Sequence, residues 1–190
     1  MSGDKVIGAR TTKGDIQARN TILAIGPRTS KLAPEVARSI LVRPVKGYSL
    51  TYDTSETNDL PSYPIIDEGY HLGVVPINGK LRSVGFAEFA NYDDNINPNI
   101  VSKIDRFTKS VYPNLADMMN RCKQTPWTGF RAISADGLPY IGETSRKGLW
   151  LNTGHGHLGW TLAAGSAEML ADLITGKQTS VEYSNFAVNR

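Results

Sequence analysis

Cysteine is almost absent from this sequence, since the 190 residues include only Cys122. A single cysteine excludes a disulfide framework within the chain and a cysteine-rich zinc site. Its simplest interpretation is a small buried hydrophobic residue in a reducing compartment. No run approaches the roughly 18 apolar residues of a membrane-spanning helix, and the opening Met1–Lys5 lacks the apolar core of a secretion signal.

Neither sign of charge is in large excess, because 21 Lys and Arg stand against 18 Asp and Glu. The basic residues are dispersed, which argues against a polybasic nucleic-acid tail, and 40% hydrophobic content argues against a disordered chain. No ordered Ser, His and Asp set or carboxylate pair indicates hydrolysis. The composition therefore indicates a globular chain of one domain or two small ones.

The first part of the chain predicts short β-strands and a short helix. Thr21–Ile25 is a continuous apolar run of the kind found in strands buried on both faces. Ser30 is positioned to cap a helix that ends near Arg38. Two earlier strands are expected at residues 6–12 and 16–18.

A β-rich segment follows over residues 42–87. Tyr48, Leu50 and Tyr52 alternate with polar residues, which is the period of a half-buried strand. Asn78-Gly79 lies between two apolar segments and is a strong hairpin signal. Three further strands are expected at residues 63–66, 70–77 and 80–86.

Helical periodicity returns after Asn97-Pro98. Apolar residues then recur on one helical face, at Ile100, Ile104, Phe107 and Val111. A shorter helix is expected over residues 115–122. A strand over residues 125–133 follows, and a turn at Asp136-Gly137 is expected to pair it with residues 138–141.

Gly154, Gly156 and Gly159 spell G-x-G-x-x-G between a predicted strand, residues 148–153, and a predicted helix, residues 159–175. A dinucleotide fingerprint is one interpretation, but a Rossmann unit would continue with further strands, whereas a polar tail follows here. Independently of that motif, glycines let the backbone approach a ligand, and a helix start offers unpaired N–H donors. The alternative interpretation of this segment is a strand-to-helix turn whose glycines serve only the close packing of the helix.

Four motifs in this order resemble the D-amino-acid oxidase superfamily of FAD-dependent oxidoreductases, and within it the small subunits of bacterial D-amino acid dehydrogenases. The motifs are Arg43–Leu50, Trp127–Arg131, Asp136–Gly142 and Leu149–Ala163. The resemblance extends over nearly the whole chain, whereas the βαβ unit that holds the ADP part of FAD in this superfamily has no counterpart. The chain therefore resembles the C-terminal half of such a protein, or a fragment.

The fold class implied by the resemblance is α+β. A mixed β-sheet substrate-binding domain with helices on one face is expected over residues 41–133. Residues 1–40 and 134–176 are expected to form the remnant of a Rossmann-like FAD-binding domain, and residues 177–190 a tail. Without its partner strands, this remnant is expected to expose apolar surface around Ile22–Ile25 and Leu149–Leu151.

The resemblance also implies the substrate-binding residues. Arg131 matches the arginine that holds the substrate α-carboxylate through two parallel hydrogen bonds, with a solvated arginine as the alternative. Ala132 stands where proline is common in the family. The carbonyl of His157 is implied to accept a hydrogen bond from the substrate amine. Tyr48 and Tyr70 are candidates for lining the substrate pocket, with ordinary packing as the alternative.

FAD is the implied cofactor, and the helix start after the glycine loop is expected to face the flavin and stabilise its negative charge when reduced. The candidate cofactor-binding residues are Gly154, His155, Gly156, Leu158, Gly159, Trp160 and Thr161. Lys46 is expected either near the flavin or solvated. His155 and His157 with His71 are an alternative metal set, but no carboxylate or cysteine completes it.

The implied reaction is oxidative deamination of a D-amino acid, in which a hydride passes from Cα to flavin N5 and the imino acid hydrolyses to a 2-oxo acid and ammonia. The resemblance favours a dehydrogenase, and the electron acceptor is left open between a quinone-linked chain and O2. A cytoplasmic protein without a nucleic-acid partner is expected, with peripheral association with the inner face of the plasma membrane and a homo-oligomer as further options. Two alternatives remain open: a non-catalytic domain of the same fold, and an amine oxidase resembling glycine or sarcosine oxidases.

Overall fold

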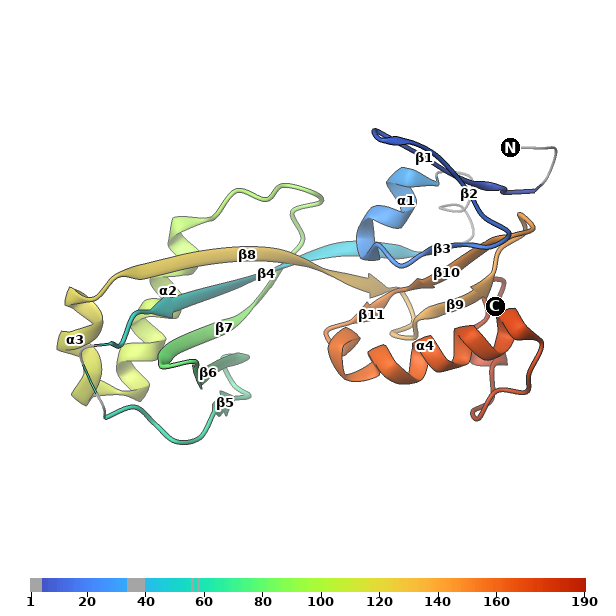
Figure 1. The fold of residues 1–190 in the computed structure, drawn as a ribbon. Helices are drawn as coiled ribbons and strands as arrows, with labels where there is room; N and C mark the ends of the chain where they lie inside the picture. Colours follow the sequence, from blue (N-terminus) through green and yellow to red (C-terminus); the bar gives the residue numbers. More distant parts are fainter. Residues whose placement is uncertain (1–4, 34–39, 56, 58) are drawn as a thin grey trace. The chain divides into compact units, whose positions relative to one another are not determined.

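The computed structural model describes residues 5–33, 40–55, 57 and 59–190. The chain divides into two compact units, residues 1–44 with 131–190 (unit 1) and residues 45–130 (unit 2). It passes from one unit to the other within two long strands, β4 (Val42–Tyr52) and β8 (Gln124–Ser134). Strands and helices occur together in each unit, which confirms the α+β fold class (Figure 1).

Unit 2 is built on an antiparallel sheet. Strands β5 (Ile65–Asp67), β6 (Leu72–Ile77) and β7 (Lys80–Glu88) follow β8 and β4 in the order β8-β4-β7-β6-β5. Ile77 pairs with Lys80 across a two-residue turn. Asn78 and Gly79 in this turn have φ of 50° and 69°, the left-handed values of a type I′ hairpin. The hairpin predicted from Asn78-Gly79 is confirmed.

Two helices cover one face of this sheet. Helix α2 (Pro98–Val111) begins after Asn97, whose side chain accepts a hydrogen bond from the amide of Asn99 at 3.0 Å. A 3₁₀ turn, η2 (Pro113–Leu115), leads into the shorter helix α3 (Ala116–Arg121). The spacing of apolar residues predicted α2, and a shorter helix was expected over residues 115–122; the structure confirms both.

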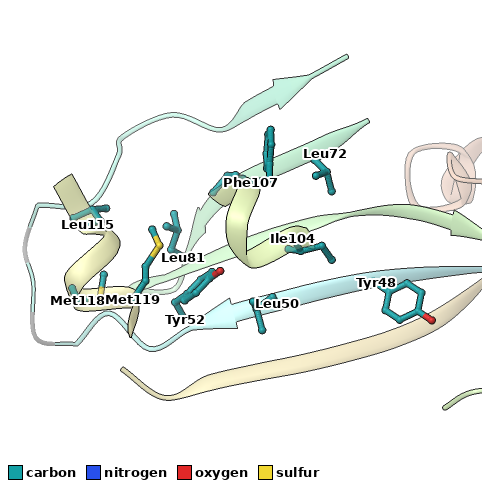
Figure 2. Packing of buried hydrophobic residues seen from close by; sticks show 11 residues of the cluster. Tyr48, Leu50, Tyr52, Leu72, Leu81, Ile104, Phe107, Leu115, Met118 and Met119 are labelled. Carbon is teal, nitrogen blue, oxygen red and sulfur yellow. The ribbon is translucent and has the colours of Figure 1, made fainter. Parts of the chain in front are cut away.

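The core of unit 2 lies between the sheet and these helices. Tyr48, Leu50 and Tyr52 project from β4 into the core, where Ile104 and Phe107 of α2 also lie (Figure 2). The predicted core-facing positions of β4 are therefore confirmed, whereas the expectation of a half-buried strand is wrong at Ser49, which is also buried. Residues that alternate with the core positions project from the other face of the sheet, which α2 and α3 leave uncovered.

Unit 1 contains a three-stranded sheet and the longest helix. Strand β10 (Leu149–Thr153) is central, with β3 (Thr21–Leu23) parallel on one side and β9 (Tyr140–Glu143) antiparallel on the other. Helix α4 (Gly159–Thr175) ends at Gly176, which has a left-handed φ of 71°, as predicted. Met169 and Leu170 pack this helix against Ile141 of β9.

The remaining elements of unit 1 lie near the start and the end of the chain. The predicted first two strands form a hairpin, β1 (Gly8–Thr11) with β2 (Gly14–Gln17). After β3 come a 3₁₀ turn, η1 (Gly26–Arg28), and a short helix, α1 (Thr29–Leu32). A 3₁₀ turn, η3 (Ser184–Phe186), lies near the C-terminus. A two-residue strand, β11 (His155–Gly156), precedes α4.

Four expectations about unit 1 need correction. Residues 138–141 do not pair with the strand over 125–133, because β9 pairs with β10. Ser30 does not cap α1: it lies inside that helix, which begins after Arg28 without a side-chain cap. The predicted end of this helix near Arg38 lies outside the described residues. Residues 177–190 are not a loose tail, since Val188 is buried in the core of unit 1.

The fourth correction concerns the strand that was expected to be buried on both faces. Leu23 is buried, but Ile22 and Ile25 are 46% and 42% exposed. Exposed apolar surface was therefore correctly expected at these two isoleucines and wrongly at Leu149 and Leu151, which are buried in the core of unit 1. The edge of β3 that faces away from β10 has no partner strand in the three-stranded sheet.

Candidate active site

The glycine loop connects β10 to α4 through a tight turn. Gly154 is buried with a φ of 87°, a left-handed value that strains other residues. A Cβ added to it would lie 3.3 Å from Val42 Cγ2 and 3.4 Å from Tyr140 Cδ2. Glycine at this position therefore serves both the backbone conformation and the close packing of the loop.

The N-terminus of α4 follows the loop directly and is open to solvent. Leu158 occupies the N-cap position, and no side chain caps the helix. The first-turn N–H groups at Gly159, Trp160 and Thr161 are therefore left for a ligand or water. Trp160 is 96% exposed and Leu158 is also exposed. This helix start combines N–H donors, partial positive charge and exposed apolar side chains.

Arg131 is brought close to this loop by strand pairing within unit 1. Strand β11 pairs antiparallel with β8, with His155 opposite Ile133 and Gly156 opposite Ala132. Arg131 is thus the next residue along β8 from the Gly156 pair. Its side chain is partly buried, and burial lowers the pKa of its guanidinium, although an arginine stays protonated in proteins.

The two histidines of the loop differ in their surroundings. Burial lowers the pKa of His155 below its ordinary value, so its ring is neutral at pH 7. Its Nε2 is buried without a hydrogen-bond partner in the part of the chain that the structure describes. His157 is exposed at the turn before α4. Among the described residues no group of three His, Cys, Asp or Glu side chains is arranged to hold a metal ion.

Tyr48 and Tyr70 have different environments in unit 2. Tyr48 is fully buried in the core, and its hydroxyl donates a hydrogen bond to Glu88 Oε2. Tyr70 is exposed, and its ring centroid lies 5.6 Å from that of Phe107 on α2. Both rings are on the helix-covered side of the sheet. Their roles in lining a substrate pocket stay predictions.

Lys46 is more deeply buried than the sequence indicated, since its side chain is 1% exposed. Its Nζ lies 3.0 Å from Glu88 Oε2 and 3.5 Å from Asp93 Oδ2, and it donates to the carbonyl of Asn95 at 3.0 Å. The solvated alternative is therefore wrong. Lys46 and these partners, together with Tyr48, are referred to below as the Lys46 network. The positions of charged residues along the sequence did not predict it, because Glu88 lies in β7 and Asp93 in the loop after β7.

The hydrogen bonds of the Lys46 network also determine which of its side chains are charged. Burial alone lowers the pKa of Lys46, but hydrogen bonds with Glu88 and Tyr48 outweigh burial and raise it above its ordinary value. The Tyr48 hydroxyl and then the Lys46 ammonium lower the pKa of Glu88. Burial and the hydrogen bond to Glu88 raise the pKa of Tyr48. At neutral pH the network therefore contains a charged lysine, a charged glutamate and a neutral tyrosine.

A family model described as "FAD dependent oxidoreductase" matches residues 1–173. The chain belongs to this family of FAD-dependent oxidoreductases. The D-amino acid dehydrogenase of Granulibacter bethesdensis is 33% identical over 188 residues, which are 99% of this chain and 44% of that protein. That of Vibrio vulnificus is 36% identical over 177 residues, 93% of this chain and 42% of that protein. The chain thus spans less than half the length of these curated relatives.

Solved structures of other oxidoreductases share the fold of this chain. Glycine oxidase from Geobacillus kaustophilus matches with a TM-score of 0.84 at 24% identity, over 98% of this chain and 50% of that one. L-proline dehydrogenase from P. horikoshii matches with a TM-score of 0.82 at 18% identity, over 100% of this chain and 51% of that one. At these identities the likeness establishes the fold and does not distinguish substrates.

The residues after β10 fit the flavin that the family implies. An uncapped helix start would supply N–H donors to an electron-rich ring edge, and the partly exposed Gly156 has no side chain that would stand between the backbone and a planar group. No helix among the described residues is long and apolar enough to cross a membrane.

Proposed function

We propose that the protein carries out FAD-dependent oxidative deamination of D-amino acids, and that this chain supplies its carboxylate-binding arginine and its flavin-facing loop. The observation that carries the proposal is the pairing of Gly156 with Ala132, which sets Arg131 beside the glycine loop. Relatives named D-amino acid dehydrogenase support the substrate class. We further propose that the ADP part of FAD is held by protein outside these residues, because the chain covers only part of those relatives.

Arg131 is proposed to hold the substrate α-carboxylate. A guanidinium binds a carboxylate through two parallel N–H···O bonds, which fixes the orientation of the Cα–H bond as well as the position of the acid. Partial burial of Arg131 strengthens such a charge-assisted pair, since fewer water molecules compete for it. The arginine therefore contributes both binding and alignment.

The glycine loop and the start of α4 are proposed to hold the flavin ring. FAD, when bound, supplies the two-electron acceptor for oxidation of the substrate Cα–N bond. The amides at Gly159, Trp160 and Thr161 are oriented to donate to an acceptor that gains negative charge, and the helix dipole favours the same charge. The carbonyl of His157 is proposed to accept a hydrogen bond from the substrate amine and to position its nitrogen.

The electron acceptor is proposed to be a quinone-linked carrier, as the word dehydrogenase in the names of the relatives suggests. Reduction of a quinone analogue or a dye by D-alanine, with little oxygen consumption, is the expected result. Peroxide formation from glycine or sarcosine would instead favour an amine oxidase.

The experiment that tests the proposal uses the purified chain and the complete open reading frame that contains it, each supplied with excess FAD. Retained flavin is measured by visible absorbance, and D-alanine-dependent dye reduction is compared with L-alanine. We expect the complete protein to retain FAD and to prefer the D enantiomer. A folded, colourless complete protein without D-alanine-dependent reduction would contradict the proposal and would favour the non-catalytic alternative.

A further inference from the structure

Arg82 lies on the face of the unit 2 sheet that α2 and α3 leave uncovered. Leu50, Ser83 and Val74 are aligned across β4, β7 and β6 and belong to the buried side. The neighbouring residues of β7, Arg82 and Val84, therefore project from the opposite side. Arg82 is aligned with Thr51 and Val75, and Val84 with Ser49 and Gly73.

The guanidinium of Arg82 is held in a fixed position on this face. Its Nη2 donates to Ser49 Oγ at 3.1 Å, and its Cζ lies 5.9 Å from the centroid of the Trp127 ring. The Trp127 ring in turn lies against Gly129, where an added Cβ would come within 2.3 Å of Trp127 Cη2. Ser49 is buried. The cation is therefore pre-positioned between a hydroxyl and an aromatic ring.

No acidic side chain of the described residues balances this guanidinium. Its Nε is buried and has no hydrogen-bond acceptor there. This contrasts with Lys46, which has two carboxylates, and with Lys80 on the same strand, whose Nζ lies 3.6 Å from Asp53 Oδ2. Buried polar groups normally have partners, so a cation in this state indicates a missing acceptor.

The surface beside Arg82 is apolar. Ile66 of β5 and Val84 of β7 lie on either side of Gly73, and both are exposed. A Cβ added to Gly73 would lie 3.5 Å from Val84 Cγ2 and 3.8 Å from Ile66 Cγ1. The glycine thus leaves a shallow apolar surface next to the charged group. A single unbalanced cation matches one carboxylate, whereas a phosphate would favour further donors.

We propose that Ser49, Arg82 and Trp127 form a binding site for a small carboxylate with an apolar body, referred to here as the Arg82 site. The carboxylate accepts hydrogen bonds from the Arg82 guanidinium, and the apolar part lies on Val84 and Ile66. All three residues belong to unit 2, whereas Arg131 belongs to unit 1, and the proposed site does not depend on the proposed redox activity. Amino acids and 2-oxo acids with apolar side chains belong to the ligand class.

The test is a titration of the 190-residue chain with 3-phenylpropionate, followed by NMR of the tryptophan indole N–H signals. The chain has three tryptophans, and Trp127→Phe assigns the relevant signal. We expect a saturable shift of the Trp127 signal, and at least tenfold weaker binding of the uncharged 3-phenylpropanamide. Equal binding of acid and amide, no shift, or an equal shift with sodium chloride at the same ionic strength would overturn the proposal.

Variants locate the site. Arg82→Gln is expected to abolish the carboxylate-dependent shift, and Arg82→Lys to weaken it, because lysine keeps the charge but loses the planar fork. Arg106→Gln, at an exposed position on α2, and Arg131→Gln are expected to leave it unchanged. Unmoved signals of Trp150 and Trp160 and an unchanged circular dichroism spectrum report intact folding. Loss of the shift in Arg131→Gln with retention in Arg82→Gln would assign the binding to Arg131 and refute the Arg82 site.

Discussion

Lys46 Nζ lies 3.0 Å from Glu88 Oε2 at a β-bulge of unit 2, where the lysine is buried and the glutamate is partly exposed. Lys46 pairs with Glu88 and Tyr48 with Gly85, so Gly47 opposes two residues, Phe86 and Ala87. Phe86 has a φ of 62°, an unusual value for an aromatic residue. The ion pair therefore joins the two strands at the point where their register changes.

Removing one partner of this pair is expected to destabilise unit 2. Lys46→Met leaves the partly buried Glu88 without its cation, and we expect a cost of about 1–3 kcal/mol, less than for a fully buried pair, because water still reaches the Glu88 carboxylate. Urea denaturation followed by hydrogen exchange of the β4 and β7 amides measures the loss. Lys103→Met, at an exposed position on α2, is the matched control and should be neutral.

The double variant Lys46→Met with Glu88→Leu separates electrostatics from packing. Because the double variant removes both charges together, it should recover much of the stability that Lys46→Met loses. A double variant as unstable as the single one would show that the lysine stem, and not its charge, stabilises the bulge.

The same pair predicts a pH window for the stability of unit 2. The folded-state pKa of Glu88 is lowered, so its contribution is present above its ordinary pKa of 4.5 and is lost as the pH falls through the lowered value. The folded-state pKa of Lys46 is raised, so its contribution is present below 10.5 and is lost as the pH rises through the raised value. Unfolding of the wild type and of Glu88→Gln at acidic pH checks this, and identical acid profiles would contradict it.

Arg190 should protect a turn of unit 1 against acid. Its guanidinium makes two hydrogen bonds to the Asp136 carboxylate, at 2.7 and 3.0 Å, and lies 3.8 Å above the Tyr140 ring centroid. The hydrogen bonds from Arg190 lower the pKa of Asp136 to about 2. The stabilising charge is present above the ordinary pKa of 3.8 and is lost as the pH falls through about 2.

An NMR titration of the Asp136 side chain measures this effect directly. The wild type should titrate near pH 2, and Arg190→Ala should return the pKa toward its ordinary value. Arg10→Ala, which breaks an exposed pair with Asp15, is the control and should leave Asp136 unchanged. An Asp136 that titrates at its ordinary pKa in the wild type would contradict the arrangement.

Gly137, which lies outside the glycine loop, is a matched control for the substitution of Gly154 within it. Both have a left-handed φ, 87° and 81°, but a Cβ at Gly154 would approach Val42 whereas one at Gly137 would meet nothing within 4 Å. Gly137→Ala should therefore cost about 1 kcal/mol from conformation alone, and Gly154→Ala distinctly more. Thermal unfolding of both variants measures the difference, and equal losses would show that packing around Gly154 is unimportant.

Sequence patterns predicted the elements whose signals are local. Asn78-Gly79 indicated its hairpin because the turn residues themselves have the required φ, and Asn97 indicated the start of α2 because it supplies the capping oxygen. The pairing of β9 with β10 was not predictable, since the choice of a strand's partner depends on the packing of the whole unit.

Within the candidate site, the spacing of the glycines predicted the loop and the helix of residues 159–175, which the structure confirms. The role of Arg131 rests on a resemblance and stays a prediction. The burial of Lys46 and the unbalanced charge of Arg82 depend on residues distant in the sequence, namely Glu88, Ser49 and Trp127. A lysine or arginine within a strand gives no signal of such partners.

Arg131 gives the most specific prediction about substrate binding. Arg131→Gln in the complete enzyme should raise the KM for D-alanine by roughly two orders of magnitude, since a lost charged hydrogen-bond pair is worth about 2–4 kcal/mol. Arg131→Lys should recover only part of the binding, and Arg106→Gln should change nothing. An unchanged KM in Arg131→Gln would remove this residue from the site.

The proposed FAD-dependent oxidation of D-amino acids is tested most directly by adding D-alanine to the FAD-loaded complete protein without oxygen. The visible flavin absorbance is expected to bleach with D-alanine and much more slowly with L-alanine. Flavin absorbance that persists with D-alanine, or that bleaches equally with both enantiomers, would contradict it.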